Sequence, residues 1–194
     1  MVSLKPGSGV REALEQRLLV VTGIMASGKS TIAHLLAKQF ERGVHVEADT
    51  LQRMIVSGGV AVDQPGEPAG EAARQLRLRL RHLCLLGRSF YSTGFSVVLD
   101  DIIIGERWCE LQDELNGLPF TLIVLAPSQL VVWQRDLERE KPPQDRAWIT
   151  YLDAELRRTL TGIGLWVDSS GQTPEETVRY VLDRLLPPVR GDSP

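Results

Sequence analysis

Four residues near the amino end have the types and the spacing of a turn that holds a polyphosphate. Gly23, Gly28, Lys29 and Ser30 satisfy every constrained position of the pattern G-x-x-x-x-G-K-[S/T]. In such a turn, successive backbone N–H groups point inward at the start of a helix and surround phosphate oxygens. We therefore expect a nucleotide to contact the whole segment. Its residues are Gly23, Ile24, Met25, Ala26, Ser27, Gly28, Lys29, Ser30 and Thr31.

The residues on either side of this motif support the interpretation. Residues 17–22 form a short apolar run rich in valine and leucine, which predicts a buried strand. Apolar residues at helical spacing then predict a helix over residues 29–41. A strand, a turn and a helix are the context that the motif needs, so a chance glycine turn is disfavoured. Lys29 would reach the β- and γ-phosphates of ATP, and the Ser30 hydroxyl would coordinate Mg²⁺.

Three aspartates follow two later predicted strands. Asp49 follows a strand over residues 44–48, and Asp100 and Asp101 follow a strand over residues 95–99. Ligands bind at the carboxyl ends of the strands in a parallel sheet. We expect Asp49 to accept the proton of an incoming hydroxyl, and Asp100 or Asp101 to hold the metal or contact the substrate. The alternatives are an N-cap role for Asp49 and a polar strand end for the aspartate pair.

Arginines flank a proline-rich break at residues 141–145. Arg135 and Arg139 lie in the charged helix before the break, and Arg146 begins the helix after it. The two helices and the break together resemble a lid over residues 135–150. Arginines on such a lid can neutralise the charge that develops during phosphoryl transfer, so we assign Arg139 and Arg146 a catalytic role. The alternative is a solvated helix face on which these arginines pair with interleaved acidic residues.

Residues 71–92 carry two conflicting patterns. Part of the segment alternates like a half-buried strand, but its length and flanks predict one long helix. Four arginines at helical spacing would form a stripe on it: Arg74, Arg77, Arg81 and Arg88. We interpret the stripe as a solvated face, with binding of an anionic substrate as the alternative. Residues 58–70, rich in glycine and proline, predict a loop that could move over a substrate. Trp148 is expected to be a packing residue, with substrate contact as the alternative.

Composition limits the class of protein. With 194 residues, the chain fits one domain with its own core, and its net charge of −3 argues weakly against a dedicated nucleic-acid binder. Cys84 and Cys109 have no metal-like spacing and predict reduced thiols. No apolar run has the length of a membrane helix, and residues 1–9 lack a signal-peptide core, so we expect a cytoplasmic protein whose first nine residues are mobile.

Strands and helices alternate along the rest of the chain. Further strands are predicted over residues 120–125 and 165–168, and helices over residues 50–57, 106–115, 127–140, 146–160 and 173–186. The last helix begins with a capping threonine, a proline at its first position and a glutamate three residues after the cap. This alternation predicts an α/β fold with a parallel sheet covered by helices on both faces.

The arrangement resembles the small phosphate-loop kinases, and within them the chloramphenicol phosphotransferase-like branch, with shikimate kinase as another relative. The resemblance extends from residue 18 to residue 186 and is carried by residues 23–31, 46–51, 135–146, 164–170 and 173–176. It implies a P-loop NTPase three-layer sandwich with a five-stranded parallel sheet in the order 2-3-1-4-5 and a small helical lid. It also implies transfer of the ATP γ-phosphate to a hydroxyl, with Asp49 as the base and Arg135 near the adenine.

Three functions remain open from the sequence. The first is an ATP- and Mg²⁺-dependent kinase that acts on a hydroxyl of a small molecule, such as an antibiotic or a metabolite. The second is a polynucleotide 5′-hydroxyl kinase, because such enzymes also place an aspartate and a nearby arginine after the second strand, here Asp49 and Arg53. We therefore include Arg53 among the expected substrate contacts, together with Asp49 and Asp101 at the strand ends. The third is a nucleotide-dependent binding module without transfer chemistry. The sequence does not identify the acceptor or the oligomeric state.

Overall fold

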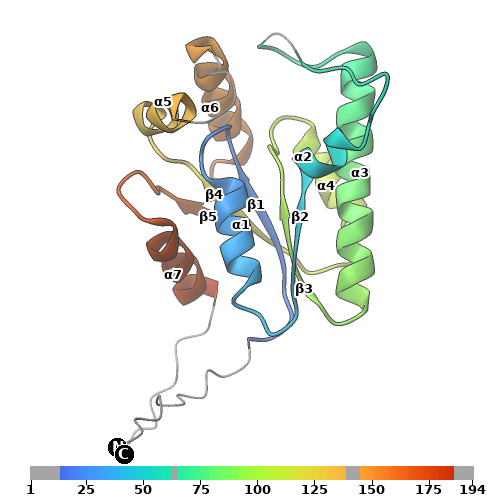
Figure 1. Cartoon of the computed structure of the whole chain (residues 1–194), viewed down its shortest axis with the longest axis vertical. Coiled ribbons are helices and arrows are strands. Elements are labelled where there is room, and N and C mark those ends of the chain that lie inside the picture. The colour runs from blue at the N-terminus through green and yellow to red at the C-terminus, as the bar shows by residue number, and fades with distance from the viewer. Residues whose placement is uncertain (1–13, 63–64, 139–144, 186–194) are drawn as a thin grey trace, which may run out of the picture.

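Five parallel strands form one sheet in the order β2-β3-β1-β4-β5, which confirms the predicted strand order. The computed structural model describes residues 14–62, 65–138 and 145–185 (Figure 1). The strands are β1 (Leu18–Gly23), β2 (Gly43–Glu47), β3 (Ser96–Asp100), β4 (Thr121–Leu125) and β5 (Leu165–Val167). The helices are α1 (Lys29–Ala37), α2 (Ala48–Arg53), α3 (Gly70–Ser92), α4 (Arg107–Glu114), α5 (Gln129–Leu137), α6 (Arg146–Leu160) and α7 (Pro174–Leu185).

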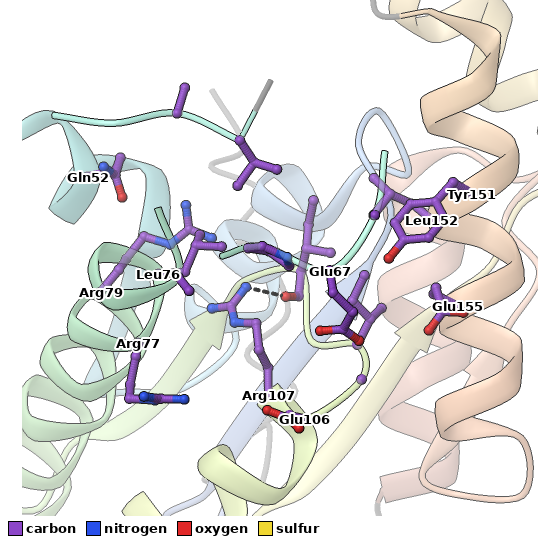
Figure 2. A pocket seen from close by; sticks show the side chains of 18 of the residues that line it. Gln52, Glu67, Leu76, Arg77, Arg79, Glu106, Arg107, Tyr151, Leu152 and Glu155 are labelled. Carbon is purple, nitrogen blue, oxygen red and sulfur yellow. Dashed lines mark hydrogen bonds between the residues drawn. The ribbon is translucent and has the colours of Figure 1, made fainter. Parts of the chain in front are cut away.

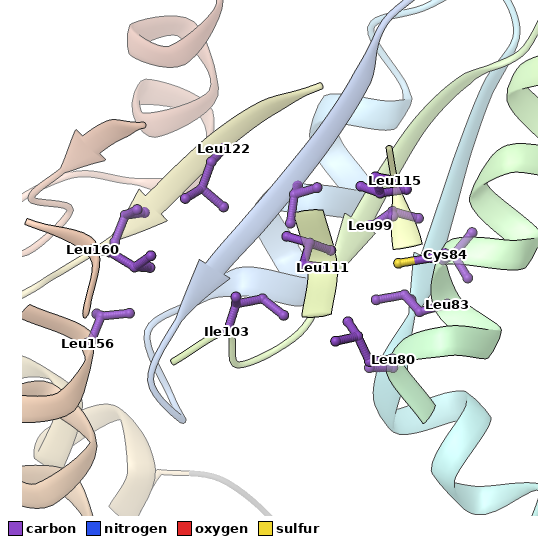
Figure 3. Packing of buried hydrophobic residues seen from close by; sticks show 14 of the residues in the cluster. Leu80, Leu83, Cys84, Leu99, Ile103, Leu111, Leu115, Leu122, Leu156 and Leu160 are labelled. Carbon is purple, nitrogen blue, oxygen red and sulfur yellow. The ribbon is translucent and has the colours of Figure 1, made fainter. Parts of the chain in front are cut away.

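The two faces of the sheet bury separate apolar clusters. Leu18 and Val20 of β1 belong to the cluster on one face, and Leu19 and Val21 to the cluster on the other, because successive side chains of a strand alternate between faces. Helices α3, α4 and α6 cover the first face (Figure 3). Helices α1 and α7 cover the second (Figure 1). Burial on both faces explains why β1 and β3 are apolar along most of their length rather than alternating.

The segment with two conflicting patterns is a helix, as predicted. Helix α3 runs for 23 residues and buries Leu80, Leu83 and Cys84 on one side. Gly87 allows it to lie close to the sheet, because a Cβ at this position would come within 3.1 Å of a methyl carbon of Leu99. The alternation in the sequence arises because arginines occupy positions on both the solvent side and the buried side of one helix. Helix α3 thereby brings the Arg79 side chain to Asp101, the residue that follows β3.

Two predicted helix starts need correction, and a third is confirmed. The N-cap alternative for Asp49 is wrong, because α2 begins at Ala48 and Asp49 lies in its first turn. Helix α5 does not begin at Pro127 but two residues later, since the Ser128 side chain accepts a hydrogen bond from the backbone of the first turn. The capping box at Thr173 is present, with reciprocal hydrogen bonds of 2.8 and 3.2 Å to Glu176.

Some expectations fall on parts of the chain that the structure does not describe. The predicted mobility of residues 1–9, the proline-rich break and Arg139 lie outside the described residues. Of the helices in the described ranges, none has both the length and the apolar character required to cross a membrane.

Candidate functional site

The loop between β1 and α1 has the geometry of an anion cradle. Gly23 ends the strand where only glycine fits, because a Cβ there would lie 2.5 Å from the Leu125 carbonyl oxygen. The left-handed conformations of Ala26 and Gly28, with φ of 54° and 95°, turn the chain into the helix. No side chain caps the first turn of α1, so its N–H groups are open to an anion. The loop can therefore receive phosphate oxygens with backbone donors.

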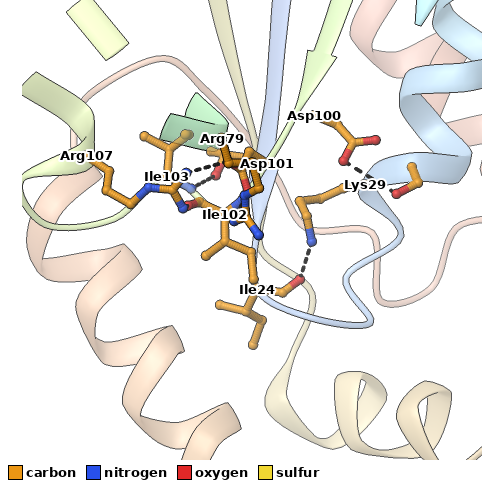
Figure 4. A network of polar contacts seen from close by, with 10 residues as sticks. Ile24, Lys29, Arg79, Asp100, Asp101, Ile102, Ile103 and Arg107 are labelled. Carbon is orange, nitrogen blue, oxygen red and sulfur yellow. Dashed lines mark hydrogen bonds and ion pairs between the residues drawn. The ribbon is translucent and has the colours of Figure 1, made fainter. Parts of the chain in front are cut away.

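A cavity of about 390 Å³ opens over this loop. Its wall includes Lys29, whose ammonium group donates a 3.0 Å hydrogen bond to the Ile24 carbonyl oxygen (Figure 4). Asp49 and Arg135 line the same cavity, and Arg135 also donates to the Ser169 carbonyl oxygen at 2.9 Å. We call this the phosphate cavity. Its full lining is Met25, Ala26, Gly28, Lys29, Ser30, Thr31, Ala48, Asp49, Arg79, Asp100, Asp101, Ile102 and Arg135.

Asp100 faces the hydroxyl that the sequence assigns to the metal. The Ser30 Oγ lies 3.4 Å from Asp100 Oδ1, and the other carboxylate oxygen lies 2.6 Å from His45 Nε2. Mg²⁺ prefers oxygen ligands and keeps several waters, so it is commonly held by one or two protein groups together with phosphates. Ser30 and Asp100 are such a pair, and their donor chemistry fits a magnesium ion beside the phosphates.

Asp101 has a different environment although it is the next residue. Its carboxylate is buried between two guanidinium groups: Arg79 donates to Oδ1 at 2.7 Å, and Arg107 donates to Oδ2 (Figure 4). The Ile102 backbone N–H also donates to Oδ1. Burial would raise the pKa of Asp101, but the charges of Arg107 and Arg79 and these hydrogen bonds outweigh it and hold the pKa below its ordinary value. Asp101 is therefore an ionised anchor for two arginines.

A second cavity of about 520 Å³ adjoins the phosphate cavity. Most of its lining comes from four segments: the loop after α2, helix α3, the stretch from β3 into α4, and helix α6 (Figure 2). Met25 and Gln52 also line it. Apolar and aromatic side chains are prominent in its wall, among them Leu76, Ile104, Trp148, Tyr151 and Leu152. We call this the acceptor cavity. The two cavities share three lining residues: Met25, Arg79 and Ile102.

The structure brings together some of the site residues predicted from sequence. Asp49, Asp100, Asp101 and Arg135 join the loop in the lining of the phosphate cavity, whereas Gly23, Ile24 and Ser27 are not part of that lining. Arg53 lines neither cavity and instead donates to Glu47 and Thr50. Arg146 also lines neither; its guanidinium lies 4.6 Å from the Trp133 ring centroid.

Sequence reasoning missed Arg79 and Arg107. The arginine stripe that it singled out does not contain Arg79, which lies on the buried side of α3, three residues after Leu76 and four before Leu83. A charged residue at an apolar position of a helix is the signal that was available, because burying a charge requires a partner. Trp148 was weighed as a packing residue; it packs against the core and also lines the acceptor cavity.

Comparisons with known proteins agree with this geometry. Residues 16–186 match the chloramphenicol phosphotransferase-like protein family, so the chain belongs to that family. One similar solved structure is a sugar kinase from Janibacter, with 25% sequence identity and a TM-score of 0.66; the match covers 88% of this chain and 94% of that one. Another is the tunicamycin resistance protein of Deinococcus radiodurans, with 17% identity and a TM-score of 0.65; the match covers 88% of this chain and 96% of that one. A third is the shikimate kinase of Bacteroides thetaiotaomicron, with 16% identity and a TM-score of 0.61; the match covers 87% of this chain and 98% of that one.

A search of curated proteins finds no match to the sequence. The fold is nevertheless that of the P-loop kinases, and the family and the fold together support a phosphotransferase that acts on a small molecule.

Proposed function

We propose that the protein is an ATP- and Mg²⁺-dependent phosphotransferase that moves the γ-phosphate to a hydroxyl of a small molecule. One observation carries the proposal: a polar cavity over the phosphate-binding loop meets a largely apolar cavity at Met25, Arg79 and Ile102. A donor in the first cavity and an acceptor in the second would have their reacting atoms at this boundary. Holding two substrates in contact supplies much of the rate enhancement in phosphoryl transfer.

The donor side rests on the loop and its first helical turn. Backbone N–H groups and Lys29 would bind the β- and γ-phosphates of ATP. Ser30 and Asp100 would hold Mg²⁺, which when bound neutralises phosphate charge. Arg135 lines the phosphate cavity and belongs to helix α5 of the predicted lid, so we place it beside the nucleotide base. Arg139 and Arg146 remain predicted lid residues that act when the nucleotide is bound.

Asp49 is the candidate general base. It lies in the first turn of α2, is exposed to solvent and lines the phosphate cavity. In the proposed step, the acceptor oxygen forms a bond to the γ-phosphorus while the bond from that phosphorus to the β,γ-bridging oxygen breaks. ADP leaves with the bridging oxygen, and the hydroxyl proton passes to the Asp49 carboxylate. A positioned base of this kind contributes about 10²–10⁴-fold to the rate.

The acceptor side points to a small molecule with apolar parts. A cavity of about 520 Å³ lies within the range of roughly 300–1,000 Å³ that small-molecule sites occupy. The neighbours described as a sugar kinase and a tunicamycin resistance protein indicate that sugars and antibiotics belong in the first set of acceptors to test. A polynucleotide end is less favoured, because Arg53 lines neither cavity.

The experiment is a screen for acceptor-dependent formation of ADP. Sugars, hydroxylated antibiotics, nucleosides and a 5′-hydroxyl oligonucleotide are incubated with ATP, Mg²⁺ and the protein, and products are identified by mass spectrometry. We expect at least one small hydroxyl compound to gain one phosphoryl group, and the Lys29→Ala variant to form this product more slowly. Phosphorylation of the oligonucleotide only, with steep salt dependence, would replace the proposal by the nucleic-acid kinase. ATP binding without turnover of any compound would favour a binding module.

A further inference from the structure

Arg79 occupies the boundary between the phosphate cavity and the acceptor cavity. It is the charged residue among the three that line both, since the others are Met25 and Ile102 (Figure 2). Its side chain comes from α3 and is 13% exposed, so the guanidinium is largely removed from solvent. The reacting phosphorus atom would have to pass this boundary. Arg79 is therefore placed where negative charge would develop during transfer.

Asp101 and Arg107 fix the position of Arg79. Asp101 accepts from both guanidinium groups, so two positive charges share one carboxylate and one positive charge remains in excess. Arg107 has a second anchor, because it donates a 2.6 Å hydrogen bond to the Ile102 carbonyl oxygen. Within the described residues, the hydrogen bond of Arg79 to Asp101 is its single anchor. The excess positive charge is thus held in place, but Arg79 has fewer hydrogen-bond partners than Arg107.

Arg79 also has N–H donors that make no hydrogen bond within the described residues. A guanidinium has five N–H donors in a rigid fork, and Arg79 uses Nη2 to reach Asp101. Its Nε is shielded from solvent and has no hydrogen-bond partner among the described residues. Leaving a shielded donor unpaired is unfavourable, and a phosphoryl oxygen that accepts from it would remove that cost. An arginine fork matches the geometry of two phosphoryl oxygens.

We propose that Arg79 is a catalytic residue that contacts the phosphoryl group in transit and stabilises its developing negative charge. The inference rests on the proposed function and adds to it the arginine that phosphoryl transfer requires. The predicted lid residue Arg146 lies over the Trp133 ring instead of at the cavity boundary. Arg79 is already at this boundary because Asp101 holds it there, and a preorganised charge has no reorganisation cost at the moment of reaction. Asp101 is accordingly a positioning residue.

The primary test measures binding of ADP with and without aluminium fluoride, in the presence of Mg²⁺. ADP with aluminium fluoride imitates the transferring phosphoryl group, and such analogues bind more tightly than the ground state. We expect aluminium fluoride to tighten ADP binding to the wild-type protein and to the matched control Arg74→Gln. Arg74 is on the same helix, exposed, and paired with Glu71. The Arg79→Gln variant should bind ADP alone with normal affinity. The factor by which aluminium fluoride tightens ADP binding should be at least about 10-fold smaller than in the wild-type protein.

Kinetics with an accepted substrate provide the second readout. Arg79→Gln should lower kcat by about 10²–10³-fold, with ATP affinity and acceptor KM changed little, because the contact forms mainly in the transition state. Arg79→Lys keeps the charge beside Asp101 and should fold even if Arg79→Gln does not; it should recover part of kcat. Asp101→Asn should lower kcat in the wild-type background and add little to Arg79→Gln, since it acts through Arg79.

The outcomes separate this inference from the proposed function. An active Arg79→Gln variant beside an inactive Asp49→Asn variant would overturn the role of Arg79 and leave the phosphotransferase intact. A change in acceptor KM with normal kcat would also overturn it, because Arg79 would then bind ground-state substrate. If the wild-type protein itself shows no enhancement by aluminium fluoride and no turnover, the proposed function fails, and this inference fails with it.

Discussion

The two cavities are built in opposite ways. One short stretch, residues 25–31, supplies six of the thirteen residues in the wall of the phosphate cavity, and carboxylates are added from the ends of two neighbouring strands. The wall of the acceptor cavity comes from segments spread between residues 25 and 155, and much of it is apolar. Donor recognition therefore depends on backbone geometry that a local sequence specifies. Acceptor recognition depends on how side chains from distant elements meet.

This difference has a functional consequence. A phosphate-binding loop can be shared by proteins that act on different acceptors, because its backbone donors do not depend on the second cavity. Changes in α3, α4 or α6 can alter the acceptor without disturbing the loop. If the two cavities have separate tasks, substitutions should affect either ATP binding or the acceptor, and substitutions at their boundary should affect the transfer step.

Asp49→Asn should give the largest effect, because it removes the base while it leaves the loop intact. We expect kcat to fall by about 10²–10⁴-fold. The dissociation constant for ATP should stay within about 2-fold of the wild type, since Asn has the same shape as Asp. Single-turnover kinetics and calorimetric titration with ATP measure the two quantities. Normal transfer by this variant would show that the phosphate cavity only binds the donor.

Lys29→Ala should weaken the donor side by a smaller factor. The lysine supplies charge-assisted hydrogen bonds to the phosphates, each worth about 1.5–3 kcal/mol, so ATP affinity should fall by about 10–100-fold and turnover should fall with it. Acceptor binding, measured without ATP, should not change, because Lys29 does not line the acceptor cavity. A variant that loses acceptor binding as strongly as ATP binding would show that the two cavities are one site.

Trp148→Ala should affect the other cavity. The indole lies in the acceptor cavity and makes an edge-to-face contact with Tyr151, their ring centroids 6.3 Å apart. Loss of this apolar surface should raise the acceptor KM by about 10-fold and leave ATP affinity unchanged. Trp108→Ala is the control, because Trp108 is also partly buried but lines neither cavity. Equal changes in both variants would mean that the effect arises from stability, which thermal unfolding measures.

The same contrast explains how much of the molecule the sequence could predict. The long helix α3 and the Thr173 capping box were predicted correctly, because each depends on a periodic pattern or on residues close together in the chain. The strand order was also predicted correctly, but from the family resemblance and not from a local pattern. The start of α5 was predicted wrongly, since proline fits a first helical position but the side chain of Ser128 supplies the cap. Local rules compete at helix ends, and the winning contact depends on the geometry of the chain.

The acceptor cavity could not be predicted in the same way. Arg79 and Arg107 lie 28 residues apart in the sequence and meet at Asp101 only because α3 and α4 pack on the same face of the sheet. No local pattern connects them. The sequence did place Asp100 and Asp101 at one strand end, but their different environments come from the neighbouring elements. His45 and Ser30 face Asp100, whereas the two arginines enclose Asp101.

Arg53→Gln should give the smallest effect and tests whether an acceptor site exists outside the two cavities. Arg53 is exposed and pairs with Glu47 at 3.2 Å, an interaction worth less than about 1 kcal/mol. We expect kcat and KM for a small acceptor to change by less than about 2-fold, because Arg53 lines neither cavity. Oligonucleotide binding, measured at low and high salt, is the companion experiment. If Arg53→Gln weakens that binding and reduces its salt dependence, the acceptor is a nucleic-acid end that lies across α2, and the acceptor cavity has another role.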